Sequence, residues 1–324
     1  MRQFNSVLCI VDTEENSDEA ILHSIKIAED HQATITFVST MDASKLWYST
    51  EHYTYFDQSL QHLAEVKRSA IASRISEISP KVKANIEVLS GIGFLEIIRS
   101  VVTNQHDLVV KCAEDVAWLE RMFGSEDMQL IRKCPCPVLM LKPGHNDSFH
   151  RILATVDINE DVDEVEEVRV QAALNNKVLE YGATMAMPEL TEMHIGAAWE
   201  AYAEHFYRYG AFSRMPEEEV DRYVEQIRRE RSDDLDQLVR KMETMLGKDA
   251  VSYLQPRVHL AKGKPYKEIP KMVEKYDIDL IVMGTVGRVG IPGLIIGNTA
   301  ESILEQVKCS VLALKPDGFE TPVR

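Results

Sequence analysis

"SVLCIVDTEENSDEAI" at residues 6–21 and "RILATVDINEDVDEVEEV" at residues 151–168 share one layout. Each is a short β-branched run followed by a Val–Asp pair, an acidic loop and a helical pattern. The same features in the same order, far apart in one chain, indicate a repeated unit.

Two further pairs of stretches match toward the ends of these units. "HDLVVK" at 106–111 corresponds to "IDLIVM" at 278–283, and "KCPCPVLMLKPG" at 133–144 corresponds to "KCSVLALKPDG" at 308–318. Agreement at both ends of each half predicts a duplicated domain with its joint near "KPGHNDSFH". We therefore expect domain one at residues 1–146 and domain two at residues 147–324.

Within each half, apolar runs of strand length alternate with helical patterns. The expected strands are 6–11, 34–39, 84–89, 107–111 and 137–142 in domain one, and 151–156, 191–198, 256–260, 279–283 and 310–315 in domain two. The expected helices are 17–31, 58–79, 94–104 and 125–133, then 163–181, 217–246, 265–276 and 298–308. This alternation predicts an α/β fold of two tandem, open, five-stranded parallel sheets with helices on both faces, as in Rossmann-like proteins.

Composition narrows the function classes. The 324-residue chain carries a formal net charge of −16, which would repel a nucleic-acid backbone. No stretch approaches the roughly 18 consecutive apolar residues of a membrane span, and the N-terminus does not resemble a secretory signal. Five cysteines, an odd number, argue against a disulfide framework. We expect a cytoplasmic protein without a nucleic-acid partner or a membrane span.

The glycine-rich stretch "MGTVGRVGIPGLIIGNTAES" at residues 283–302 is the main candidate site. Gly284 and Gly287 follow a predicted strand, and Gly297 precedes a predicted helix, so bare backbone N–H groups there could hold a phosphate. Arg288 could add a cation. The alternative is that Asn298 caps the helix, with Glu301 three residues on, and no ligand is needed.

The same stretch resembles the G-x₂-G-x₉-G-[S/T] signature of the universal stress protein family, and the tandem layout looks like its two-domain E type. The resemblance implies ATP binding, with the loop glycines holding phosphates and ribose, the aspartate after the first strand contacting adenine, and Mg²⁺ carried by the phosphates. The residues implied are Asp157, Met283, Gly284, Gly287, Gly297, Asn298 and Thr299. Asn298 departs from the family pattern, because it lacks the hydroxyl of Ser or Thr.

Domain one departs further from that signature. Its counterpart, "KCAEDVAWLERMFGSEDM" at 111–128, keeps Gly124 and Ser125 but has Cys112, Ala113 and acidic residues where the first glycines belong. We therefore expect a degenerate site in domain one and one nucleotide per chain. Lys111 stands where Met283 stands in domain two, either as a surface lysine or as a contact for an anion.

The last strands of the two domains would each leave an apolar edge, "CPVLMLK" and "CSVLALK". The family resemblance implies that these edges pair with each other, so that the chain mimics a dimer within one molecule. A homodimer of whole chains is a further possibility.

Two other features stay ambiguous in the sequence. The aromatic segment at 197–215 is a lid, a partner-binding helix or an extension of the helix that follows, and we favour the extension. Cys134-Pro135-Cys136 lacks a second pair or a histidine at metal-ligand spacing, which favours buried, inert thiols.

The sequence offers no recognisable catalytic constellation, neither a nucleophile elbow nor an H-E-x-x-H helix. We therefore expect a stress-response regulator or sensor that binds an adenine nucleotide, and no catalyst. The alternatives are a binding module for a lipid-like or other apolar ligand and a slow ATP hydrolase.

Overall fold

A computed structural model gives the fold of the chain. It describes residues 3–12, 17–42, 53–113, 126–144, 148–159, 165–189, 191–210, 214–286 and 296–323, without side chains at 53–58. The predicted joint at residue 146 lies outside these ranges.

Ten strands form one continuous sheet in the order β3-β2-β1-β4-β5-β10-β9-β6-β7-β8. The strands of domain one are β1 (Ser6–Ile10), β2 (Thr34–Met41), β3 (Asn85–Ser90), β4 (Leu108–Cys112) and β5 (Val138–Leu141). Those of domain two are β6 (Arg151–Thr155), β7 (Glu192–Trp199), β8 (Arg257–Lys262), β9 (Leu280–Gly284) and β10 (Ser310–Leu314). Each domain therefore contributes five parallel strands in the same internal order, as the repeat predicts.

The two half-sheets meet through β5 and β10, which pair antiparallel with Leu139 opposite Leu312. These residues occupy the same position in the two repeats, so an approximate twofold axis passes through the centre of the sheet. The predicted pairing of the two edges is confirmed. The open sheets of the prediction are thus halves of a single sheet, and neither apolar edge is left to water.

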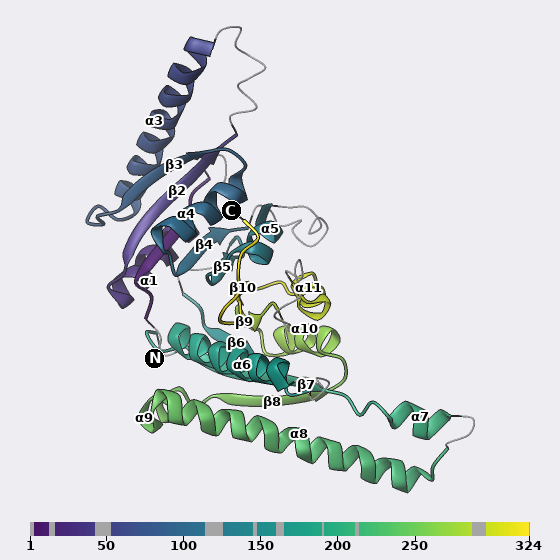
Figure 1. Cartoon of the computed structure of the whole chain (residues 1–324). Helices are drawn as coiled ribbons and strands as arrows, with labels where there is room; N and C mark the ends of the chain where they lie inside the picture. Colours follow the sequence, from purple (N-terminus) through teal and green to yellow (C-terminus); the bar gives the residue numbers. More distant parts are fainter. Residues whose placement is uncertain are drawn as a thin grey trace.

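Helices cover both faces of the sheet (Figure 1). Domain one supplies α1 (Asp18–His31), α3 (Tyr53–Ile78), α4 (Gly93–Asn104) and α5 (Glu126–Lys133). Domain two supplies α6 (Val165–Ala186), α7 (Glu204–Tyr209), α8 (Glu217–Leu246), α9 (Lys248–Leu254), α10 (Pro265–Lys275) and α11 (Asn298–Leu304). The core correspondingly splits into two clusters, one on each face, and each cluster contains residues of both domains.

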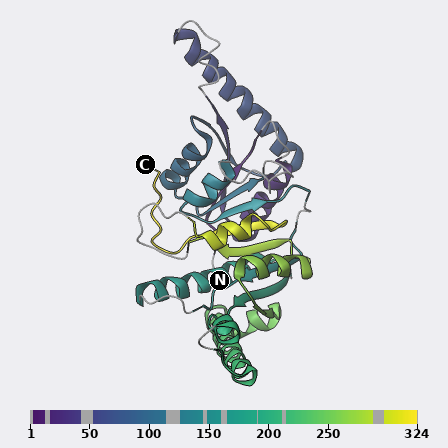
Figure 2. The same cartoon turned by 90° about the vertical axis from the view of Figure 1, so that its right-hand side faces the viewer.

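The sequence misses two short helices and misjudges the ends of others. α7 and α9 were not expected, and α11 ends at Leu304 rather than at 308. α7 lies within the aromatic segment 197–215 and packs on α8, where Tyr207 meets Tyr223 edge to face at 5.4 Å. The segment is therefore not a continuation of α8, but this contact supports the part of the expectation that it packs against its own domain. Figure 2 shows α3 and α8 at opposite ends of the molecule.

Among the described residues, we find no helix with both the length and the apolar character that a membrane crossing demands.

Candidate functional site

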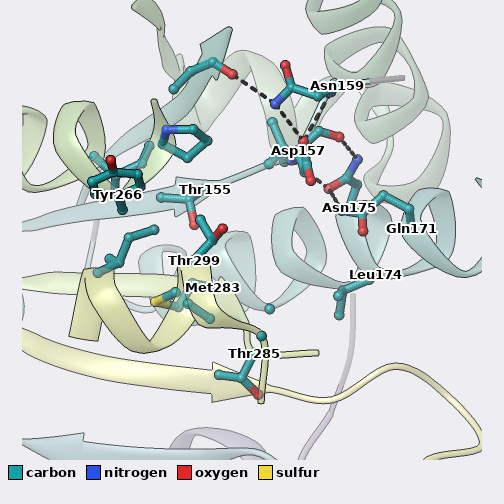
Figure 3. A pocket seen from close by; sticks show the side chains of 18 of the residues that line it. Thr155, Asp157, Asn159, Gln171, Leu174, Asn175, Tyr266, Met283, Thr285 and Thr299 are labelled. Atoms are coloured by element: carbon teal, nitrogen blue, oxygen red, sulfur yellow. Dashed lines mark hydrogen bonds between the residues drawn. The ribbon is translucent and has the colours of Figure 1, made fainter. Parts of the chain in front are cut away.

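A cavity of about 410 Å³ opens at the carboxyl ends of β6 and β9 in domain two. Loops diverge at this edge of a parallel sheet, which is where ligands bind in open α/β folds. Figure 3 shows side chains from α6, α10 and α11 turned toward the same space. The lining includes the predicted residues Asp157, Met283, Gly284, Gly297, Asn298 and Thr299. Gly287 and Arg288, also predicted, lie outside the described residues.

Asp157 is held at the cavity by polar contacts on both its backbone and its side chain. Its N–H donates to Asn175 Oδ1 at 3.0 Å, and its carbonyl accepts from Asn175 Nδ2 at 2.6 Å. Its carboxylate Oδ1 accepts from the backbone N–H and the side-chain amide of Asn159, both at 3.0 Å. The carboxylate is therefore oriented by the protein while the residue stays exposed to solvent.

Gly284 ends β9 and packs closely on α6. A Cβ on this glycine would lie 2.5 Å from Leu174 Cδ2 and 2.9 Å from Leu174 Cγ, distances that real Cβ atoms do not reach. Close approach of helix to strand therefore explains this glycine, whatever the cavity holds. Contact between Gly284 and a ligand stays a prediction.

Gly297 differs, because its φ of −80° and ψ of 143° suit any residue. Among the described residues, a Cβ here would meet one atom within 4 Å, the Thr285 carbonyl oxygen at 4.0 Å. Its N–H donates to that same oxygen at 2.9 Å. Gly297 also lines the cavity.

The alternative in which Asn298 caps α11 is wrong. Gly297 occupies the cap position, Asn298 is the first helical residue, and the Gly297 carbonyl accepts from the Glu301 N–H. The Glu301 side chain instead pairs with Arg132 of α5, linking the two domains. Asn298 and Thr299 line the cavity, are exposed to solvent and do not cap the helix.

Lys315 supports the cavity wall, and sequence reasoning missed it. Its Nζ donates to Thr285 Oγ1 at 2.6 Å, and Thr285 lines the cavity beside Gly297. Burial lowers the pKa of Lys315 to about 7, so its charged and neutral forms have similar populations near neutral pH. The repeated "LKP" after the last strand of each half was the available signal.

Asn159 and Asn175 were also missed. Asn175 falls in the middle of a helix, where a buried asparagine is unfavourable unless it makes specific hydrogen bonds. Its neighbourhood, "AALNNKVL", carries that signal, but only the structure shows which backbone it clamps.

Domain one has a buried ion pair at the positions that correspond to Met283 and Ala300. Lys111 Nζ pairs with Asp127 Oδ1 at 2.6 Å, and both residues are buried. The expectation of a surface lysine is wrong, because Asp127 neutralises this one in the interior. Gly124 and Ser125 lie outside the described residues.

Comparison with known proteins agrees with this geometry. The sequence profile of the Universal stress protein family matches residues 3–142 and 176–315. The chain belongs to the universal stress protein family. Both matches fall within the two predicted repeats, so each half is a family unit.

The relatives carry the same family name. Universal stress protein E of Escherichia coli K12 is 31% identical over 232 residues, covering 71% of this chain and 67% of that protein. A Universal stress protein E homolog of Haemophilus influenzae is 24% identical over 323 residues, covering 97% and 98%. The family assignment therefore extends over the whole tandem arrangement.

Solved structures show the same fold. A universal stress protein from Archaeoglobus fulgidus superposes with a TM-score of 0.64 at 19% identity, covering 98% of each chain. A functionally unknown protein from Pseudomonas aeruginosa PAO1 also reaches 0.64 at 21% identity, covering 97% of this chain and 93% of that one. The predicted fold class is confirmed.

Proposed function

We propose that this universal stress protein is a cytoplasmic regulator or sensor that binds one adenine nucleotide, ATP with its Mg²⁺, in the domain-two cavity. The observation that carries the proposal is Gly297, which lines the cavity and whose missing side chain no packing contact among the described residues explains. Packing accounts for Gly284, so Gly297 is the informative glycine.

The size and the polarity of the cavity suit a nucleotide. Small-molecule sites enclose about 300–1,000 Å³ and combine apolar walls with a few placed polar groups. The 410 Å³ cavity has apolar walls at Leu174, Ile269 and Met283, and polar groups at Asp157 and Thr299. A fixed carboxylate is a natural acceptor for the amino group of adenine.

The phosphates would lie toward Gly297, Asn298 and Thr299. Asn298 offers an amide N–H₂ in place of the family's hydroxyl, so it keeps a hydrogen-bond donor at that position. Gly287 is included in the proposed site because it belongs to the glycine signature, and Arg288 because its positive charge follows in the same stretch. Mg²⁺ would be carried by the phosphates, as is usual for this ion, and would neutralise part of their charge.

Calorimetric titration of the full chain with Mg-ATP tests the proposal. We expect one site per chain in wild type and an affinity at least about tenfold lower in Gly297→Val, since the new side chain fills ligand space. Gly124→Val, at the sequence counterpart in domain one, is the matched control and should bind as wild type does. Ligand-free melting curves of Gly297→Val should match wild type.

Two other outcomes would contradict the proposal in different ways. Absence of Mg-ATP binding by wild type, with an apolar molecule retained in native mass spectrometry, would favour the module for a lipid-like ligand. Steady release of phosphate that Gly297→Val abolishes would make the chain a slow ATP hydrolase. Equal affinities in wild type and Gly297→Val would remove the ligand role of Gly297.

A further inference from the structure

The two thiols of Cys134-Pro135-Cys136 lie against each other where the chain passes from α5 to β5. Their Sγ atoms are 3.5 Å apart, which is van der Waals contact. The chain bends at residues 135 and 136, and this bend turns the two side chains to the same side. Cys134 is buried, whereas Cys136 is partly exposed to solvent.

The second repeat provides an internal comparison. Counting back from the paired residues Leu139 and Leu312, Cys136 corresponds to Cys309, and Cys134 corresponds to Val307. Domain two therefore keeps one thiol at this junction and domain one has two. Cys9, Cys112 and Cys309 are all buried, so Cys136 is the most accessible thiol of the chain.

We propose that Cys134 and Cys136 are a redox modification site, and that a low-molecular-weight disulfide such as glutathione disulfide converts them to an intramolecular disulfide. In the first step the Cys136 thiolate attacks one sulfur of glutathione disulfide, forming a mixed disulfide and releasing one glutathione thiolate. In the second step the Cys134 thiolate attacks the Cys136 sulfur and releases the second glutathione thiolate. The two cysteines lose two electrons and two protons, and both glutathiones leave as thiols.

The order of these steps follows from exposure and distance. Cys136 is the less buried of the two residues, and Cys134 is already in contact with the sulfur that it must attack. The mixed disulfide should therefore be short-lived in wild type.

The environment of Cys136 sets the speed of the first step. The hydrogen bond with Cys134 and burial both raise the pKa of Cys136 well above its ordinary value. Because the thiolate is the attacking species, the rate should rise about tenfold for each pH unit while the pH stays below that pKa. The pair should resist brief exposure at neutral pH and respond to sustained oxidation.

The experiment treats the full-length chain with excess glutathione disulfide at pH 7, 8 and 9, blocks remaining thiols with N-ethylmaleimide and records intact and peptide masses. We expect wild type to lose two reactive thiols without gaining glutathione, and the peptide containing 134–136 to carry the link. Cys9, Cys112 and Cys309 should take up the maleimide after unfolding.

Variants separate the two steps. Cys134→Val, which reproduces the residue of the second repeat, should accumulate one glutathione on Cys136. Cys136→Ser should neither take up glutathione from glutathione disulfide nor form an intramolecular disulfide, because Cys134 is buried. Three results would each overturn the proposal: five free thiols in wild type after prolonged treatment at pH 9, a stable glutathione adduct in wild type, or a disulfide that includes Cys9, Cys112 or Cys309. The wild-type measurement decides the matter even if a variant folds poorly.

Discussion

The two half-sheets have the same strand order, but the side chains at the carboxyl edges of their strands differ. In domain one the fourth residue of β4 is Lys111, which pairs with Asp127 in the interior. In domain two the fourth residue of β9 is Met283, and Ala300 stands where the repeat places Asp127. Met283 and Ala300 line the cavity. At these two positions domain one has a buried ion pair, whereas domain two has apolar residues that line a cavity.

The comparison shows that the two repeats keep the same fold with different side chains at this edge of the sheet. A lysine and an aspartate that neutralise each other can occupy a space that would otherwise need a ligand or water. An ion pair is stable in the interior only while both partners are present, because a single buried charge is strongly unfavourable. Lys111 and Asp127 therefore depend on each other for their stability in the interior.

Lys111→Met should give the largest effect, because it leaves Asp127 buried without its lysine. We expect a loss of about 3–5 kcal/mol in the free energy of unfolding, measured by urea denaturation. The double variant Lys111→Met/Asp127→Ala, which reproduces the domain-two residues, should recover most of that loss. If the single variant lost less than about 1 kcal/mol, the ion pair would not be what holds this site closed.

Gly284→Ala should come next, because its methyl group collides with Leu174. Overpacking of this kind lowers the free energy of unfolding by about 1–3 kcal/mol. In a Leu174→Ala background, where the collision is relieved, the same change at Gly284 should cost much less. Equal losses in both backgrounds would show that Gly284 is kept for a reason other than the approach of α6.

Much of the fold could be predicted because the signals were local and repeated. Strand runs such as "SVLCI" and "RILAT" are buried whichever domain holds them, so their composition alone marks them. α7 escaped prediction because six residues give too little periodicity. The pairing of the two half-sheets could be predicted only from the family resemblance, because an apolar edge strand in the sequence does not show which strand it pairs with.

The site was only partly predictable, for a physical reason. Glycines and Asp157 mark the cavity in the sequence because loops and strand ends are local features. Asn175 and Lys315 act through contacts between elements far apart in the chain, as with Lys315 and Thr285. The reason for Gly284 was equally hidden, because Leu174 lies on a different element.

Asn175→Ala and Ser17→Ala compare how the two repeats hold the chain after their first strand. Ser17 Oγ accepts from the Asp12 N–H at 3.0 Å and donates to its carbonyl at 3.1 Å, so it makes the same two contacts as Asn175 does with Asp157. Each variant leaves a backbone pair unsatisfied, and we expect losses of about 1–2 kcal/mol in urea denaturation. Mg-ATP affinity should fall in Asn175→Ala alone, and an equal fall in Ser17→Ala would place nucleotide binding in domain one too.

The smallest expected effect is a loss of stability at low pH, and we expect it to arise in domain two. His194 Nδ1 and His259 Nε2 lie 2.8 Å apart on β7 and β8, and Tyr276 stacks on His259. By register, domain one has Thr36 and Glu87 at these positions. Burial, together with the neighbouring His194, Lys275 and Arg257, lowers the pKa of His259 to about 4.

The sign of the pH dependence follows from that lowered pKa. An unfolded histidine has a pKa near 6.5, so between about pH 6.5 and 4 the unfolded chain binds a proton at residue 259 that the folded chain does not. Stability should therefore fall as the pH drops through this window and level off below it. Since His259 is half-buried, we discount the shift for solvent screening and expect its contribution to be about 1 kcal/mol.

Urea denaturation at pH 7 and pH 4.5 should show a smaller acid-induced loss in the free energy of unfolding for His259→Asn than for wild type. His150→Asn, at an exposed histidine, serves as the control. An identical acid-induced loss in wild type and His259→Asn would place the acid sensitivity elsewhere in the chain.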